Sequence, residues 1–154
     1  MKTLNQWFEE YSVSHQNPKN KAIHYICVPA IFFSIVGLLM SIPSTILNKT
    51  LQLNHPIIEN WATITLLFVL FFYVRLSIIM AIKITFFAIL CLILNFYIGQ
   101  YLTLWKFSIT LFILAWFGQF YGHKIEGKKP SFLKDLQFLL IGPAWVLQNL
   151  FSKK

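Results

Sequence analysis

Two stretches of the chain, Ile23 to Met40 and Phe107 to Phe120, contain no charged residue. Their lengths approach the roughly 20 apolar residues that a helix needs to cross the hydrocarbon core of a bilayer. Only 12% of the 154 residues are charged and 57% are hydrophobic, whereas soluble domains carry about 25% charged residues. A chain so poor in charge cannot cover the surface of a water-exposed domain. These runs therefore exclude an ordinary soluble domain and predict a lipid environment.

The order of the apolar runs predicts an all-α fold, a polytopic membrane helical bundle with about four to five membrane-embedded helices. Ile23 to Ile42 is the first expected crossing. Trp61 to Trp105 is too long for one crossing and about right for two at a rise of about 1.5 Å per residue. We place the turn between these two near Arg75 to Ser77, with a turn at Lys83 as the alternative.

Phe107 to Tyr121 is the next expected crossing, ended by Gly122. Residues 136–151, with Gly142 and Pro143 in the middle, are short for a crossing, so a re-entrant or interfacial segment is also open. The chain forms one integral membrane domain, 1–154, composed of a leader over 1–21 and a helical bundle over 22–151.

Within the leader, apolar residues recur at the spacing of one helical face and predict an amphipathic helix in the membrane interface. They are Leu4, Trp7, Phe8 and Tyr11. Trp61, Trp105 and Trp145 are candidate anchors at the two interfaces. The two cysteines, Cys27 and Cys91, lie inside apolar runs and are expected to be small core residues.

The chain has 13 Lys plus Arg against 5 Asp plus Glu. Most of the lysines flank apolar runs, which favours an anionic lipid surface as the partner and argues against nucleic acid. An even number of crossings returns the chain to its starting face, so the leader and the Lys124 to Lys134 loop share one side. Their lysines make that side cytoplasmic, in a bacterial inner membrane or in the endoplasmic reticulum.

Three of the four histidines are predicted to meet on this face. His15 and His24 precede or open the first crossing and His123 follows the fourth, whereas His55 lies on the opposite face, where it serves a turn. Imidazole with a carboxylate is the ligand chemistry of catalytic iron or zinc sites. A histidine at a helix end also commonly caps the terminus. We favour a metal site because ionisable groups at membrane depth usually line one.

Glu126 has three possible roles in such a site: a metal ligand, a partner that orients His123, or an anionic member of the lysine-rich loop. Gln119, His123 and Glu126 share one helical face if the helix continues through Gly122, and Asn20 lies one turn before His24. The sequence contains no nucleophile elbow and no phosphate-binding glycine loop, so metal chemistry is the favoured enzymatic reading. Two rivals are a haem between His24 and His123 and a non-enzymatic transporter or scaffold.

Two motifs also carry a resemblance to a known family. The segment Tyr11 to Pro29, the segment Trp116 to Pro130 and the later Gly142-Pro143 are similar to the small integral-membrane 2-hydroxy fatty acid dioxygenases. That family is typified by the fungal enzyme that converts phytosphingosine metabolites to odd-numbered fatty acids. The resemblance extends over nearly the whole chain, and its specific content lies in these motifs.

The resemblance implies a non-haem Fe(II)-dependent dioxygenase of fatty acid α-oxidation. It would take a long-chain 2-hydroxy fatty acid and O2, remove the carboxyl carbon and leave a fatty acid or aldehyde one carbon shorter. By match to the family motifs, His15, His24 and His123 would be catalytic iron ligands, with Glu126 as a further candidate. A second set of expected substrate contacts comprises Asn20, Gln119 and Lys124, the last as a partner for the carboxylate.

Overall fold

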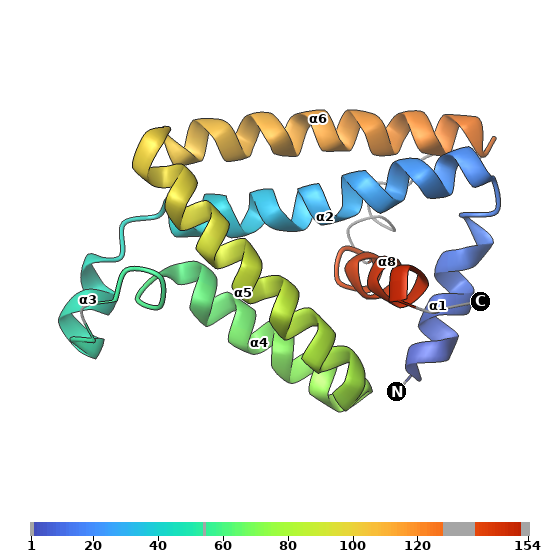
Figure 1. Ribbon diagram of the computed structural model, residues 1–154. Helices are drawn as coiled ribbons and strands as arrows, with labels where there is room; N and C mark the ends of the chain where they lie inside the picture. Colours follow the sequence, from blue (N-terminus) through green and yellow to red (C-terminus); the bar gives the residue numbers. More distant parts are fainter. Residues whose placement is uncertain (1, 54, 128–137, 152–154) are drawn as a thin grey trace.

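The computed structural model describes residues 2–53, 55–127 and 138–151. Over these residues the protein is all-α, with seven helices and no strand, which confirms the all-α part of the predicted fold class (Figure 1). The helices are α1 (Leu4–Val13), α2 (Pro18–Met40), α3 (Thr45–Leu51), α4 (Trp61–Leu76), α5 (Ile78–Tyr101), α6 (Leu104–Ile125) and α8 (Ile141–Phe151). The amphipathic helix predicted in the leader is α1, and the first predicted crossing is α2.

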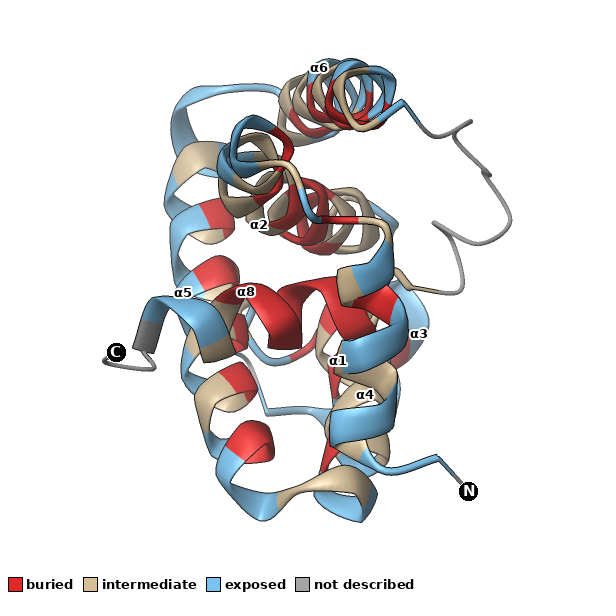
Figure 2. Ribbon diagram, turned by 90° about the vertical axis from the view of Figure 1, so that its right-hand side faces the viewer, coloured by how far each residue is buried: buried red, intermediate tan, exposed pale blue. Residues whose placement is uncertain are grey.

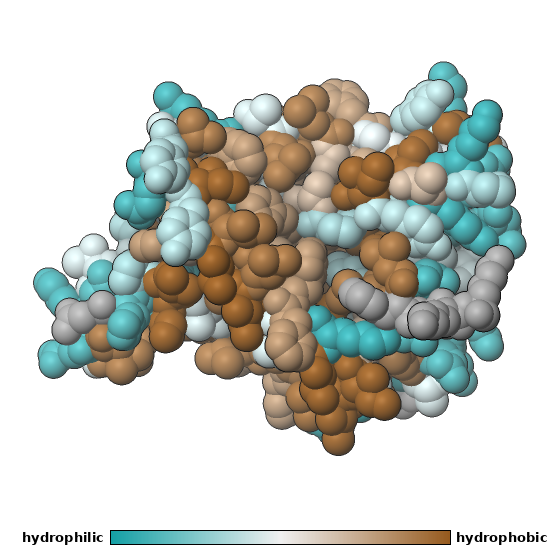
Figure 3. Space-filling view, in the orientation of Figure 1, coloured by the Kyte–Doolittle hydropathy of each residue, from teal (hydrophilic) through white to brown (hydrophobic). Residues whose placement is uncertain are grey.

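Within the described part of the chain, α2 and α5 are each long and apolar enough to cross a membrane. They have 23 and 24 residues, or about 35 Å of helix at about 1.5 Å per residue. The α4 helix is apolar but shorter, with 16 residues. Hydrophobic side chains gather between two hydrophilic ends of the molecule (Figure 3). By length and composition, two helices therefore favour a membrane location.

The long apolar stretch from Trp61 to Trp105 folds into two helices, as predicted. The chain reverses at Ser77, whose extended backbone ends α4 and whose hydroxyl caps α5 by accepting the Met80 N–H. This confirms the turn near Arg75 to Ser77 and excludes the alternative at Lys83. Lys83 lies inside α5, where its ammonium group donates to the Gln148 side chain of α8 at 3.0 Å.

Two predicted helix boundaries were wrong. The helix expected to end at Gly122 continues to Ile125, because Gly122 packs inside it against α2. Gly142 and Pro143 lie in the first turn of α8 rather than in the middle of a segment. Proline is tolerated there because the first N–H groups of a helix have no intrahelical partner. With 11 residues, or about 16 Å, α8 is too short to cross a bilayer.

The helix pair α2 and α6 runs antiparallel, side by side along most of its length (Figure 1). Buried residues concentrate on the facing sides of these helices and on α8 (Figure 2). On α6 the contact is formed by two glycines one turn apart, Gly118 and Gly122, in the Gly-x-x-x-Gly spacing that lets helices approach closely in membranes. A Cβ at Gly118 would lie 2.5 Å from the Cys27 sulfur, and one at Gly122 would overlap the Asn20 side chain. The small residues of α6 therefore set its distance from α2.

We predict that Gly118→Ala lowers the thermal stability of the detergent-solubilised protein. The added methyl group must displace Cys27, and overpacking of this kind costs about 1–3 kcal/mol. The double variant Gly118→Ala, Cys27→Ala should regain most of the loss, because removing the sulfur makes room for the methyl group.

Gly99→Ala is the matched control, since a Cβ at Gly99 would meet its nearest neighbour, Leu104, at 3.7 Å, an ordinary contact. Equal melting temperatures for Gly118→Ala and Gly99→Ala would contradict the close approach of α2 and α6.

Candidate metal centre

Three histidines from separate segments meet at one end of the α2–α6 pair. His15 lies in the connection between α1 and α2, His24 in the second turn of α2 and His123 in the last turn of α6. Their side chains are buried, with 2%, 0% and 3% of their surface exposed. One nitrogen from each ring lies within 4.8 Å of the other two. The predicted convergence of these histidines is therefore present, and the group could hold a metal ion.

The rings pack edge to face against one another. Ring centroids are 4.3 Å apart for His15 and His24, 5.1 Å for His24 and His123, and 5.5 Å for His15 and His123. The Nδ1 atoms of His15 and His24 lie 2.6 and 3.0 Å from the backbone oxygens of Tyr11 and Asn20. A carbonyl oxygen only accepts, so each Nδ1 carries the proton. The tautomer then presents the lone pair of Nε2, as in metal-ligating histidines held by a second hydrogen bond.

Local sequence signals fix the start of α2 and hence the direction of His24. Asn17 caps the helix by accepting the Lys19 N–H at 2.9 Å. Pro18 follows at the first helical position, where its fixed φ and missing N–H suit a helix start. His24 is then four residues after Asn20, so its ring reaches back to the Asn20 carbonyl. The cap therefore determines which side of α2 faces α6.

Aromatic packing holds the His15 ring from the other side. Tyr11 of α1 stacks on His15 with ring centroids 4.1 Å apart and planes inclined by 9°. Trp145 of α8 contacts both rings, and its indole N–H donates to the Ser12 hydroxyl at 3.1 Å. Trp145 is buried, so its prediction as an interface anchor was wrong. The helix α8 lies below α2 (Figure 2), and its Trp145 ring lies 5.7 Å from the His15 ring, centroid to centroid.

Glu126 joins the end of α6 to the connection between α1 and α2. Its carboxylate accepts hydrogen bonds from the N–H groups of Gln16 and Asn17, at 2.8 and 2.9 Å, and from the Asn20 side chain at 2.9 Å. The group of candidate ligand atoms within 4.8 Å consists of the three histidines. These contacts tie Glu126 to the segment that carries His15 and His24, whereas the predicted positioning role was directed at His123.

The same contacts determine the charge of this carboxylate. Burial acts to raise the pKa of Glu126, but the hydrogen bonds from Asn17, Asn20 and Gln16, with the nearby His15, outweigh it. The net effect holds the pKa of Glu126 below its ordinary value. Hydrogen bonds that favour the ionised form have this sign. Glu126 is therefore an anion at neutral pH in the folded protein.

We predict that Glu126→Gln lowers thermal stability at neutral pH and that the difference from the wild type shrinks in acid. A depressed pKa contributes stability above the unfolded value of about 4.3, and this contribution is lost as the pH falls through the lower folded value. Melting curves from pH 7 downward measure the difference.

Glu9→Gln, at an exposed carboxylate of α1, is the control and should show little change at either pH. A stability loss for Glu126→Gln that is the same at every pH would contradict a stabilising role for the negative charge of Glu126.

The other predicted site residues lie in different surroundings. Asn20 is fully buried, and its amide donates to Glu126 and to the Ser14 carbonyl. Gln119 is buried one turn before His123, whereas Lys124 is exposed at the end of α6. His55 lies in the connection between α3 and α4, exposed, with its carbonyl accepting the N–H groups of two following residues in a turn. The prediction that His55 serves a turn away from the site is confirmed.

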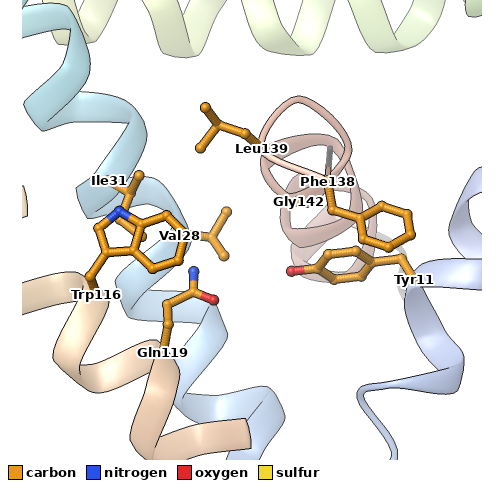
Figure 4. Close-up of a pocket in the computed structure, with 8 residues that line it drawn as sticks. All are labelled: Tyr11, Val28, Ile31, Trp116, Gln119, Phe138, Leu139 and Gly142. Atoms are coloured by element: carbon orange, nitrogen blue, oxygen red, sulfur yellow. The ribbon is translucent and has the colours of Figure 1, made fainter. Parts of the chain in front are cut away.

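A small cavity lies beside the histidines, one helical turn along α2 and α6. Its volume is about 20 Å³. In Figure 4 the side chains of Tyr11, Gln119 and Trp116 converge on it from α1 and α6. A probe-sized space of about 10–15 Å³ holds one water molecule, so the cavity admits only a small molecule as it stands. A small space with the Gln119 amide and the Tyr11 hydroxyl on its wall therefore lies about one helical turn from the histidines.

The sequence analysis did not assign Tyr11, Trp145 or Gly122 to the site. A usable signal existed for Gly122, because the Gly-x-x-x-Gly spacing from Gly118 marks a close helix contact immediately before His123. No sequence pattern could have placed Trp145 in the site, because its position depends on how α8 packs against the other helices.

These features define an all-α protein with a candidate transition-metal centre of three buried histidines at one end of a helix pair. A comparison with known families matches residues 1–154 to the family described as 2-hydroxy-palmitic acid dioxygenase Mpo1-like. The chain belongs to this Mpo1-like family, which confirms the resemblance seen in the sequence. No curated protein and no solved structure matches the chain.

Proposed function

We propose that this protein is an Fe(II)-dependent dioxygenase that shortens long-chain 2-hydroxy fatty acids by one carbon. The observation that carries the proposal is the group of three buried histidines, with candidate donor atoms within 4.8 Å of one another, in a chain of the Mpo1-like family. The family name specifies a dioxygenase of a 2-hydroxy fatty acid. The lipid bilayer is the reservoir of the substrate.

The donor set fits a first-row transition metal. Neutral imidazole suits iron, zinc, copper and nickel. Zinc has no redox chemistry, which argues against zinc in a dioxygenase, and we propose iron because the family resemblance implies Fe(II). When bound, iron supplies the electron transfer that activates O2. The chain's own contribution is to hold one nitrogen of each of the three imidazole rings within 4.8 Å of the others, with the Tyr11 and Asn20 carbonyls fixing two of the rings.

The overall reaction balances without an external reductant when the product is an acid. One 2-hydroxy acid and one O2 give the acid shortened by one carbon, one CO2 and one water. With an aldehyde product, the same inputs would give CO2 and hydrogen peroxide. Both outcomes consume one O2, so release of hydrogen peroxide, which accompanies only the aldehyde, distinguishes them.

The predicted substrate contacts remain part of the proposal. Gln119, buried next to His123, offers an amide to the 2-hydroxyl or carboxylate of the substrate. Lys124, at the exposed end of α6, attracts the carboxylate from the membrane surface. Asn20 was predicted as a third contact, and its bonds to Glu126 and Ser14 support a role in positioning the segment that carries His15 and His24.

The packing of the histidines disfavours the haem alternative. The His24 and His123 rings lie 5.1 Å apart, and His15 contacts both. A porphyrin would have to separate all three rings. An absorption spectrum without a Soret band is the expected result for the purified protein.

We predict about one Fe(II) per chain after anaerobic loading of the detergent-purified protein. His15→Ala, His24→Ala and His123→Ala should each lower iron binding at least about tenfold, as expected for loss of one of three protein ligands. Oxygen uptake with 2-hydroxypalmitic acid should then fall to background in all three variants.

His55→Ala is the matched control and should bind iron and consume oxygen like the wild type. The metal centre would be contradicted if the wild type bound no iron or if all three variants bound iron like the wild type. Either result would favour the hypothesis of a transporter or scaffold.

We further propose that α4 and α6 cross the membrane with α2 and α5, while α1 and α8 lie at or in the interface. The apolar composition of α4 and α6 supports this arrangement. The metal centre would then face the cytoplasm of a bacterial inner membrane or of the endoplasmic reticulum, because lysines gather beside it.

We predict opposite labelling of Lys19→Cys and Lys49→Cys in a Cys27→Ala, Cys91→Ala background. Both lysines are exposed, one beside the metal centre and one on α3 at the other end. In intact bacterial cells a membrane-impermeant maleimide should label the α3 position and reach the α2 position only after lysis. Equal labelling of both positions in intact cells would contradict the topology.

A further inference from the structure

An apolar groove continues from the small cavity beside the histidines. The cavity and the groove share two residues, Trp116 and Leu139. The groove has a volume of about 450 Å³ and an almost entirely apolar wall, within the range of about 300–1,000 Å³ that ligand sites occupy. Its lining residues are Ile35, Leu38, Phe112, Ile113, Trp116, Phe117, Phe120 and Leu139. The cavity and the groove therefore adjoin each other at the two shared residues, and together they form a path along α2 and α6.

The path follows one side of the α2–α6 pair. On α2 it runs from His24 through Val28 and Ile31 to Ile35 and Leu38, steps of three or four residues that keep to one helical face. Fourteen residues of helix correspond to about 21 Å at about 1.5 Å per residue. An acyl chain of a lipid spans one leaflet of the bilayer, which is about 15 Å thick, half of a hydrocarbon core of about 30 Å. The path is at least that long, so it accommodates a long acyl chain.

The path on α6 runs in the opposite direction along the chain, from His123 through Gln119 and Trp116 to Phe112. Polar groups occur only at its histidine end among the described lining residues of the cavity and the groove. There the Gln119 amide and the Tyr11 hydroxyl face the cavity (Figure 4). The wall thus changes from polar to apolar with distance from the histidines, which is the pattern that an amphiphile with one polar end requires.

We propose that this path binds the acyl chain of the 2-hydroxy fatty acid, with the carboxyl end at the histidines and the methyl end between Leu38 and Ile113. The inference rests on the proposed function. It adds where the substrate lies and how the length of the groove limits the length of the acyl chain. Entry occurs sideways from the lipid, because Ile113, Phe117 and Phe120 border the groove and are exposed.

Two other grooves provide an internal comparison. One is lined by Lys83, Phe86, Phe87, Leu90 and Leu147, and the other lies along the first half of α6 and includes Leu114. Neither shares a residue with the cavity beside the histidines. Bulk lipid would occupy all three grooves alike, whereas the substrate should prefer the one connected to the histidines.

Gly142 lines the small cavity beside the histidines. A Cβ at this position would lie 3.1 Å from Val28 and 3.3 Å from the Tyr11 hydroxyl, both of which also line the cavity. The absence of a side chain at the start of α8 therefore leaves space in the cavity.

The experiment uses photo-crosslinking in lipid nanodiscs, with Fe(II)-loaded protein kept anaerobic. The probe is 2-hydroxypalmitic acid with a diazirine at the methyl end, and unlabelled 2-hydroxypalmitic acid is the competitor. Peptide mapping should find the competed label on α2 near Leu38 and on α6 near Ile113. Competed label spread evenly over α4, α5 and α6 would overturn the proposal.

Ile113→Trp and Leu114→Trp form a matched pair, since both positions are exposed neighbours on α6 but only the first lines the groove. Ile113→Trp should weaken competed labelling about tenfold, the affinity of roughly two buried methylene groups. A 2-hydroxydecanoic acid probe ends short of Ile113, so it should label the Ile113→Trp variant as strongly as it labels the wild type. Leu114→Trp should match the wild type with both probes.

Equal effects of the two substitutions, or a loss that ignores chain length, would overturn the groove assignment. Failure of the proposed function gives a different result: iron binding or oxygen uptake is absent while the wild-type labelling pattern and its chain-length dependence remain. Turnover together with uniform labelling would instead support the proposed dioxygenase activity and contradict only the proposed acyl-chain site.

Discussion

The close approach of α2 and α6 is the contact on which the rest of the structure depends. Without side chains at Gly118 and Gly122, α6 comes near enough for His123 to pack against His24 and for Asn20 to reach Glu126. Lipid gives little hydrophobic driving force for helix association, so van der Waals contact between close backbones must supply it. The same closeness that stabilises the pair also brings two of the three histidines together. Stability and chemistry are therefore coupled at one helix interface.

The polar groups at this end of the bundle form an ordered chain of hydrogen bonds. Glu126 accepts from the backbone of residues 16 and 17 and from Asn20, whose own carbonyl accepts from His24. Unpaired polar groups in a low-dielectric interior are costly, while fully paired networks give rigidity. This network fixes the direction of the His24 ring, and the Tyr11 carbonyl fixes that of His15. The third, on α6, is placed by the helix packing itself.

Much of this arrangement could be predicted from the sequence, because apolar runs define helices and an even number of expected crossings returns the chain to the face where it started. The all-α fold, the turn at Ser77 and the meeting of His15, His24 and His123 follow from that reasoning. The end of α6 was predicted too early because a glycine in a membrane helix marks a packing contact as often as a stop. The place of Trp145 could not be predicted, since it depends on how α8 folds back onto the bundle.

The contacts of Glu126 span 106 to 110 positions of the chain, and this separation has a consequence for biosynthesis. His15 and His24 leave the ribosome early, whereas His123 and the carboxylate that clamps their segment follow only with the end of α6. A nascent chain that ends after α5 holds two imidazoles and an untethered leader. The proposed metal centre is then completed only late in synthesis, so a loaded centre would be evidence that both halves of the protein have met.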